Sequence, residues 1–407
     1  MNIQLSRSKR GSPDDRGSER HQVGAMARRV REGAPGRAVS VTGGASAPGW
    51  GRAVGENRGS RAKTLRAGGY SLVVKPRAAV GTGLLLAATA TLAVVAMSVG
   101  TLDLRFVEVV NHLFRPAAAE AGGGAVPGGQ VVRNIRLPRV ITAIFAGAGL
   151  GVSGSVFQSL SRNALGSPDV IGFTTGAATG AISQIILFQA GPLQVALGAV
   201  VGGILTAAVV YLLSRKAGVT GGYRLVLVGI GVGAVLGAIN GLLLVLGDLD
   251  NAIAANLWLS GSLDARNWGH ALAVMTGVVL LIPGVALLGR RASLMEMGDD
   301  LASQLGVPVE RTRLLLMLIA VVLAGVATGA TGPIAFVALA APQLVARLTR
   351  SQALPVISAA AMGACLLVVS DLVSQLLPLK AAFPIGRMTG ILGGMYLIWL
   401  LTRSDQV

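Results

Sequence analysis

Charged and aromatic residues are scarce in this chain of 407 residues: 13% are charged and 4% aromatic, whereas 52% are hydrophobic. Soluble globular domains carry about 25% charged residues, so most of this chain is not suited to face water. The single cysteine, Cys365, excludes an intrachain disulfide, and the histidines His21, His112 and His270 show no metal-ligand spacing. We therefore expect no metal site and no cofactor bound by this chain.

Two signatures of energy coupling are also missing. A phosphate-binding P-loop ends in Gly-Lys-Ser/Thr, but no lysine here follows a glycine. Coupling to an ion gradient usually needs a carboxylate near the middle of the membrane, and only Asp371 comes close, near one end of an apolar run. We expect Asp371 to pair with Arg387 at the outer edge, with a role in transport as the alternative. Energy is then delivered by another protein, and a proton-coupled secondary carrier is the alternative.

Long apolar runs are what the chain has in abundance. A helix needs about 20 residues to cross a hydrocarbon core of ~30 Å, and a charge at its centre costs roughly 2.5–3.5 kcal/mol. Several runs of this length contain no charged side chain. We predict an all-α polytopic membrane protein with about ten spanning helices. The predicted spans are residues 78–99, 139–160, 171–190, 193–213, 224–247, 269–289, 312–330, 333–348, 354–377 and 385–402.

The charges that are present are segregated toward the beginning of the chain. Residues 1–77 hold 16 Lys and Arg against 5 Asp and Glu, and they lack a hydrophobic period, which predicts a disordered basic tail. This tail is either a cytoplasmic segment attracted to anionic lipids or the product of a start codon placed too far upstream. Arginine without interleaved aromatic residues argues against nucleic-acid binding. Residues 78–402 then form the transmembrane domain, and 403–407 a cytoplasmic end.

Loop charges predict the orientation in the membrane. With the tail inside, every predicted inner loop carries Arg or Lys, as in 214–224 and 290–313. The outer loop 247–268 holds three Asp and one Arg. The positive-inside rule therefore places both termini in the cytoplasm. The outer loop 100–139 is the exception, because it holds five arginines.

Residues 294–313, LMEMGDDLASQLGVPVERTR, form a polar insert between two apolar runs. Apolar side chains recur there at intervals of three and four residues, which places them on one helical face: Leu294, Met297, Leu301 and Leu305. Carboxylates lie on another face: Glu296, Asp299 and Asp300. We expect Gly298 and Gly306 to divide the insert into two short helices. The apolar stripe predicts a docking surface for a soluble partner, with a solvated loop as the alternative.

Glycines predict how the helices pack. One set recurs every four residues: Gly229, Gly233, Gly237 and Gly241. The run that begins at residue 171 repeats the spacing with Gly172, Gly176 and Gly180. Small residues at this spacing let helix backbones approach closely. We expect these faces to pack helices together, and a face lining a transport pathway is the alternative.

Four stretches make the chain resemble the permease subunits of bacterial iron-siderophore and vitamin B12 ABC importers, which share the FecCD/BtuC-like fold. They begin RLPRVITAIFAG (136–181), LWLSGSLDARNW (257–268), EMGDDLASQLGV (296–325) and GPIAFVALAAPQ, the last continuing in FPIGRMTGILGG (332–348, 383–401). Within the family, NALGSPDVIGF and EMGDD are most similar to the ferric-enterobactin branch.

The resemblance implies a transport subunit without enzymatic activity that moves an iron(III)–siderophore complex inward. Haem or a cobalamin-like corrinoid is the alternative cargo. The implied partners are a second permease subunit, homologous or identical, an ATPase dimer that uses ATP, and an extracytoplasmic binding protein. The implied location is the bacterial cytoplasmic (inner) membrane.

The resemblance also assigns roles to particular residues. It seats the loop 293–306 in a groove of the ATPase. It assigns docking of the binding protein to Arg136 and Arg139, which would explain the basic outer loop; lipid headgroup contacts are the alternative. It assigns the cytoplasmic gate to Asn163, Leu165 and Tyr223.

Three positions depart from the family pattern. Ala164 stands where the family usually has proline, so we expect a less rigid gate loop. Gln343 replaces a usual histidine. Arg387 stands where a small apolar residue is usual, near the outer mouth.

Overall fold

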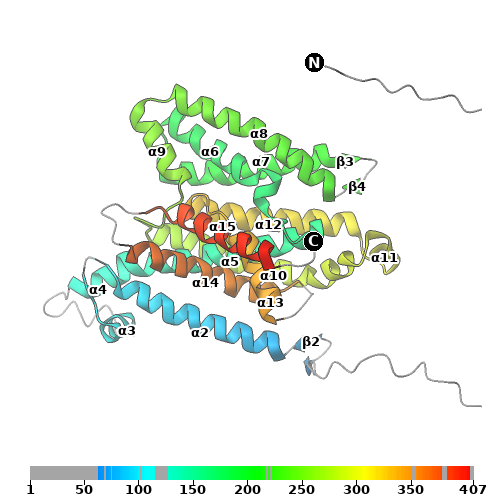
Figure 1. Ribbon diagram of the computed structural model, residues 1–407, viewed down its shortest axis with the longest axis horizontal. Helices are drawn as coiled ribbons and strands as arrows, with labels where there is room; N and C mark the ends of the chain where they lie inside the picture. Colours follow the sequence, from blue (N-terminus) through cyan, green and yellow to red (C-terminus); the bar gives the residue numbers. More distant parts are fainter. Residues whose placement is uncertain are drawn as a thin grey trace, which may run out of the picture. The chain divides into compact units, whose positions relative to one another are not determined.

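The computed structural model describes residues 63–67, 70–74, 76–100, 102–114, 127–216, 219–220, 222–349, 354–377 and 383–403. These residues all belong to one compact unit that begins at Gly59. The unit is almost entirely helical (Figure 1). Residues 1–62 of the predicted tail, and 404–407 of the predicted cytoplasmic end, lie outside the described part of the chain.

Within the described residues, ten helices coincide with the ten predicted spans, which confirms the helical membrane fold. Seven of the helical spans are long and apolar enough to cross a membrane, and α6 and α13 are shorter apolar helices. The helices are α2 (Pro76–Ser98), α5 (Leu137–Ser161), α6 (Phe173–Phe188), α7 (Pro192–Ser214), α8 (Gly222–Leu246), α10 (Trp268–Glu296), α12 (Val309–Thr331), α13 (Val337–Thr349), α14 (Val356–Leu376) and α15 (Ile385–Arg403).

Shorter elements connect these helices, and local sequence explains where several helices begin. Asp248 caps the following helix by accepting from the Asn251 amide at 2.8 Å, and Asn267 caps α10 through the His270 amide. Proline occupies the first turn of α7, where it costs no hydrogen bond. Pro138 of α5 instead follows the π-helical segment Val132–Arg136 inside one continuous helical span, Gly128–Ser161. The short helical elements are α3 (Phe106–Phe114), α4 (Pro127–Val131), η3 (Val132–Arg136), η4 (Pro168–Ile171), α9 (Leu249–Leu259) and α11 (Asp299–Gln304).

Two small antiparallel hairpins complete the fold. Strands β1 (Lys63–Ala67) and β2 (Tyr70–Val74) pair within the stretch for which we expected no regular structure. The sequence signal is the β-favouring run that starts at Tyr70, directly after the pair Gly68 and Gly69. The second hairpin joins β3 (Arg215–Lys216) to β4 (Val219–Thr220).

Helix α5 lies at the centre of the fold, where it contacts α10, α12, α13 and α14 (Figure 1). It belongs to the most buried of the seven membrane spans. Close approach of backbones explains why its sequence is rich in glycine. A Cβ added at Gly147 would lie 2.3 Å from the carbonyl oxygen of Gly363 in α14, and one added at Gly154 would lie 1.6 Å from that of Ala338 in α13. No side chain fits at either crossing.

The predicted glycine faces divide into two kinds. Gly176 and Gly180 of α6 pack closely against α7. In α8, a Cβ added at Gly233 would lie 3.6 Å from the Cα of Gly172, an ordinary contact. Gly237 and Gly241 meet nothing within 4 Å in this chain. The spacing therefore serves packing in α6, whereas half of the α8 face is left open.

Candidate functional site

The polar insert contains one separate short helix rather than two. Helix α10 continues to Glu296 instead of ending at residue 289, so the first predicted short helix is its last turn. The break comes at Gly298, whose φ of +128° is one that side-chain-bearing residues rarely adopt. Helix α11 follows, and Gly306 at φ +81° ends it. The expectation of two short helices was wrong because nothing before Gly298 interrupts α10.

The predicted apolar stripe is largely exposed. Met297, Leu301 and Leu305 are 66%, 41% and 58% exposed. Leu294 is half-buried and packs on the small cluster around Met295. Three large apolar side chains are therefore exposed on a segment that lies against α10 and α12, which is an arrangement suited to a protein partner.

Asp299 fastens this segment to the end of α5. Its carboxylate accepts from Arg162, the C-cap residue of α5, and from Arg313 of α12, the latter at 2.7 Å. Arg162 also donates to the carbonyl oxygen of Met295 at 2.8 Å. Glu296 accepts from Ser159 of α5 at 2.6 Å. Sequence reasoning missed Arg162 and Arg313, because partners this far apart in the sequence leave no periodic signal.

The predicted gate loop begins directly after Arg162. Asn163 folds it into a turn, since its Oδ1 accepts from the Leu165 amide at 2.9 Å. Gln343 of α13 donates from Nε2 to the carbonyl oxygen of Ala164 at 2.5 Å. Gln343 and Ala164, two of the three departures from the family pattern, are thus in contact. The Gln343 side-chain amide binds the loop at the position where the family usually has proline. Tyr223 lies at the start of α8 and is 79% exposed.

The predicted docking arginines lie at the opposite end of α5. Arg136 is 7% exposed and donates to the carbonyl oxygens of Met97 and Leu102, both at 2.5 Å. Arg139 forms ion pairs with Asp371 of α14 at 2.8 Å and with Asp264 at 2.6 Å. Both guanidinium groups are therefore occupied within the chain. These contacts give the docking role no support, and that role stays a prediction for both residues. Arg136 is buried, and its guanidinium donates to the Met97 carbonyl oxygen at the end of α2.

The expected pair between Asp371 and Arg387 is wrong. Asp371 pairs with Arg139 instead, and Arg387 donates from Nε to the Ser260 hydroxyl at 3.1 Å. The misassignment came from placing the ends of α14 and α15 together, whereas α5 packs along α14 and brings Arg139 to the buried carboxylate.

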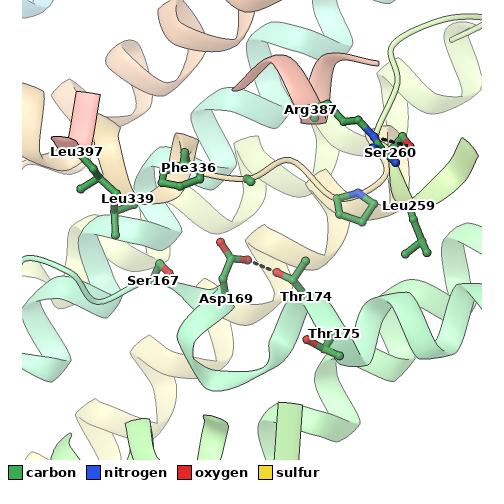
Figure 2. A pocket seen from close by; sticks show the side chains of 13 residues that line it. Ser167, Asp169, Thr174, Thr175, Leu259, Ser260, Phe336, Leu339, Arg387 and Leu397 are labelled. Carbon is green, nitrogen blue, oxygen red and sulfur yellow. Dashed lines mark hydrogen bonds between the residues drawn. The ribbon is translucent and has the colours of Figure 1, made fainter. Parts of the chain in front are cut away.

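A pocket of about 530 Å³ lies between the segment that follows the gate loop and the first turn of α15. Figure 2 shows Arg387 and Ser260 together on one side and Asp169 with Thr174 on another. Asp169 belongs to η4, which follows the gate loop, and accepts from the Thr174 hydroxyl. Its side chain is exposed to the pocket, yet the surrounding fold desolvates the carboxyl. Burial therefore raises the pKa of Asp169, and the Thr174 hydrogen bond offsets part of that rise.

Comparison with known proteins gives consistent matches across this fold. The profile of the FecCD transport family matches residues 85–403. The chain is 46% identical over 277 residues to the ferric enterobactin transport system permease protein FepG of Escherichia coli K12, covering 68% of this chain and 84% of that one. It is 35% identical over 297 residues to the iron(3+)-hydroxamate import system permease protein FhuG of Bacillus subtilis 168, covering 70% and 87%.

Two further matches extend this comparison. The hemin transport system permease protein HmuU of Yersinia pestis is 35% identical over 281 residues, covering 67% of this chain and 83% of that one. A solved structure described as an inward-facing metal-chelate type ABC transporter aligns with a TM-score of 0.68 at 26% identity. That alignment covers 81% of this chain and 99% of the other.

Proposed function

The chain belongs to the FecCD transport family, and from that membership we propose that it is the permease subunit of an ABC importer for an iron(III)–siderophore complex. The cargo we propose is of the ferric-enterobactin type. The observation that carries this proposal is the 46% identity to FepG over 84% of that protein's length. Identity to the hydroxamate and hemin permeases is lower, at 35% each.

We propose that a separate ATPase subunit drives transport by binding the exposed side chains of Met297, Leu301 and Leu305. The absence of a P-loop supports a partner that supplies ATP hydrolysis. The contacts of Asp299 support the idea that movement of the ATPase reaches the gate loop. Asp299 joins α11 to Arg162, the residue directly before that loop. A movement of α11 would therefore pull on Asn163 and Leu165 through a single ion pair.

The orientation that fits this proposal places α11 in the cytoplasm and Arg139 at the outer face of a bacterial inner membrane. Arg290, Arg291 and Arg311 flank α11, in agreement with an excess of positive charge on the inside. A second permease, an ATPase dimer and an extracytoplasmic binding protein would complete the importer. The exposed halves of α8 and α15 leave apolar surface for a second permease.

The direct test is uptake of radioactive iron by cells with and without this chain. The iron is presented as catecholate, hydroxamate and mixed chelates and as haem. We expect loss of catecholate uptake alone when the chain is absent. Loss of haem uptake instead, or of corrinoid uptake with every iron chelate unaffected, would move the assignment to another branch of the family. Normal uptake of all of these cargoes would overturn the proposed function.

A further inference from the structure

Arg387 differs in its partners from the arginines that join the helices to one another. Arg139, Arg162 and Arg313 each form an ion pair with a carboxylate. Within the described part of the chain, Arg387 forms none, and the one hydrogen bond of its side chain uses Nε and the neutral Ser260 hydroxyl. Its side chain is exposed and lines the pocket (Figure 2). Both terminal nitrogens of the guanidinium are therefore available to a bound molecule.

The backbone holds Arg387 firmly at the pocket wall. A Cβ added at the preceding Gly386 would lie 2.5 Å from the carbonyl oxygens of both Pro333 and Ser260. The first turn of α15 is thus pressed against two neighbouring segments, and Ser260 then orients the guanidinium. A charged group in a membrane domain is costly unless it is paired or functional. A position this well defined, without a carboxylate partner, suits recognition of an anion.

The other residues that line the pocket indicate which kind of anion would fit it. Phe336, Leu339 and Leu397 supply apolar surface, and Thr174 and Thr175 supply hydroxyl groups. The only described carboxylate in the lining is Asp169, and it accepts a hydrogen bond from the Thr174 hydroxyl. The pocket therefore combines one cation with apolar walls and hydroxyl groups.

We propose that Arg387 makes this pocket a binding site selective for anionic, aromatic iron chelates over neutral ones. Three catecholate dianions around iron(III) give such a complex, with net charge of about −3 and aromatic rings on its outside. The inference rests on the proposed function and names the residue that discriminates among its cargoes. Arg387 contacts the cargo, and Ser260 positions Arg387.

The test uses the complete importer in vesicles with Arg387→Gln, Arg387→Lys and Ser260→Ala. The probes are radioactive iron(III) enterobactin and a neutral ferric trihydroxamate. For Arg387→Gln we expect enterobactin uptake at low concentration to fall about tenfold or more, because a charged hydrogen bond is lost. Arg387→Lys should retain most uptake, and Ser260→Ala should show a smaller loss. Any neutral-chelate uptake should be unchanged.

Arg77→Gln is the matched control, because it removes an exposed arginine from α2, which does not line this pocket. Basal ATP hydrolysis checks that each variant assembles, and Ser260→Ala and Arg387→Lys keep the test decisive if Arg387→Gln does not assemble. Full enterobactin uptake by Arg387→Gln, or an equal loss for both chelates, would overturn the inference and leave the proposed function standing. A wild-type importer that moves neither chelate would overturn both.

Discussion

Arg139 and Asp371 form an ion pair at 2.8 Å in which the carboxylate is 1% exposed and the guanidinium 24% exposed. Gln375 adds a hydrogen bond of 2.9 Å to the same carboxylate. The pair joins the beginning of α5 to the end of α14, beside the loop that carries Asp264. A buried carboxylate without a partner is strongly disfavoured, so this ion pair adds to the glycine packing that brings the two spanning helices together.

Replacing Arg139 should therefore be costly. We expect Arg139→Gln to lower the free energy of unfolding by about 3–5 kcal/mol, because Asp371 stays buried without a counter-charge. Asp264→Asn is the control, since Asp264 is 47% exposed and an exposed pair contributes only about 0–1 kcal/mol. Thermal unfolding in detergent measures both. Equal effects of the two variants would contradict the assigned role of burial.

The docking surface on α11 gives a second prediction. Leu301→Asp should abolish uptake while the amount of protein in the membrane stays normal, because a charge replaces an exposed apolar contact to the ATPase. Gly298→Pro should do the same, because proline cannot adopt the φ of +128° found there. Ser303→Asp is the control, since Ser303 is exposed on the same helix but away from Leu301 and Leu305. Uptake that persists in both α11 variants would refute the docking role.

Gln343 should govern the mobility of the gate loop. Removing its hydrogen bond to Ala164 costs roughly 0.5–1.5 kcal/mol. In Gln343→Ala we therefore expect hydrogen exchange at the Leu165 and Gly166 amides to speed up roughly 2- to 10-fold. Gln194→Ala, at an exposed glutamine of α7, should leave these amides unchanged. Unaltered exchange in Gln343→Ala would show that the loop is held by its own turn alone.

The crossing of α5 and α13 should not tolerate even a methyl group. Gly154→Ala places a Cβ 1.6 Å from the Ala338 carbonyl oxygen, so the helices must separate, and overpacking of this kind costs about 1–3 kcal/mol or more. Gly83→Ala in α2 meets nothing within 4 Å and should be neutral or slightly stabilising. The readout is again thermal unfolding. A stable Gly154→Ala would mean that this crossing is looser than the structure places it.

The spans were predictable because hydropathy is a local property. Each apolar run has to satisfy its own backbone hydrogen bonds in lipid, which a helix does without any partner. The apolar stripe around Leu301 was visible for the same reason, since it follows from spacing along one short segment. The end of α10 was not predictable in this way. Whether the helix stops at residue 289 or continues to Glu296 depends on contacts with Ser159 and Arg162 at the end of another helix.

The site was predictable only in part. Sequence analysis singled out Asn163, Ala164, Gln343 and Arg387, but it could not say that Gln343 contacts Ala164 or that Arg387 faces a pocket with Asp169. It also assigned Arg136 to an external partner, although that side chain is buried against Met97. A sequence shows how many cationic residues a loop carries. It does not show which of them form hydrogen bonds or ion pairs within the folded chain.

The sequence by itself determined that this is a helical membrane protein, where its helices lie and which segment between them is polar, because each of these follows from short-range composition. Tertiary structure alone decided which charges meet. Arg139 and Asp371 are separated by 232 positions, and nothing local to either helix records that they become neighbours. Only the packing of glycine-rich backbones, which sets the helix order, brings that pair together and leaves Arg387 free to face the pocket.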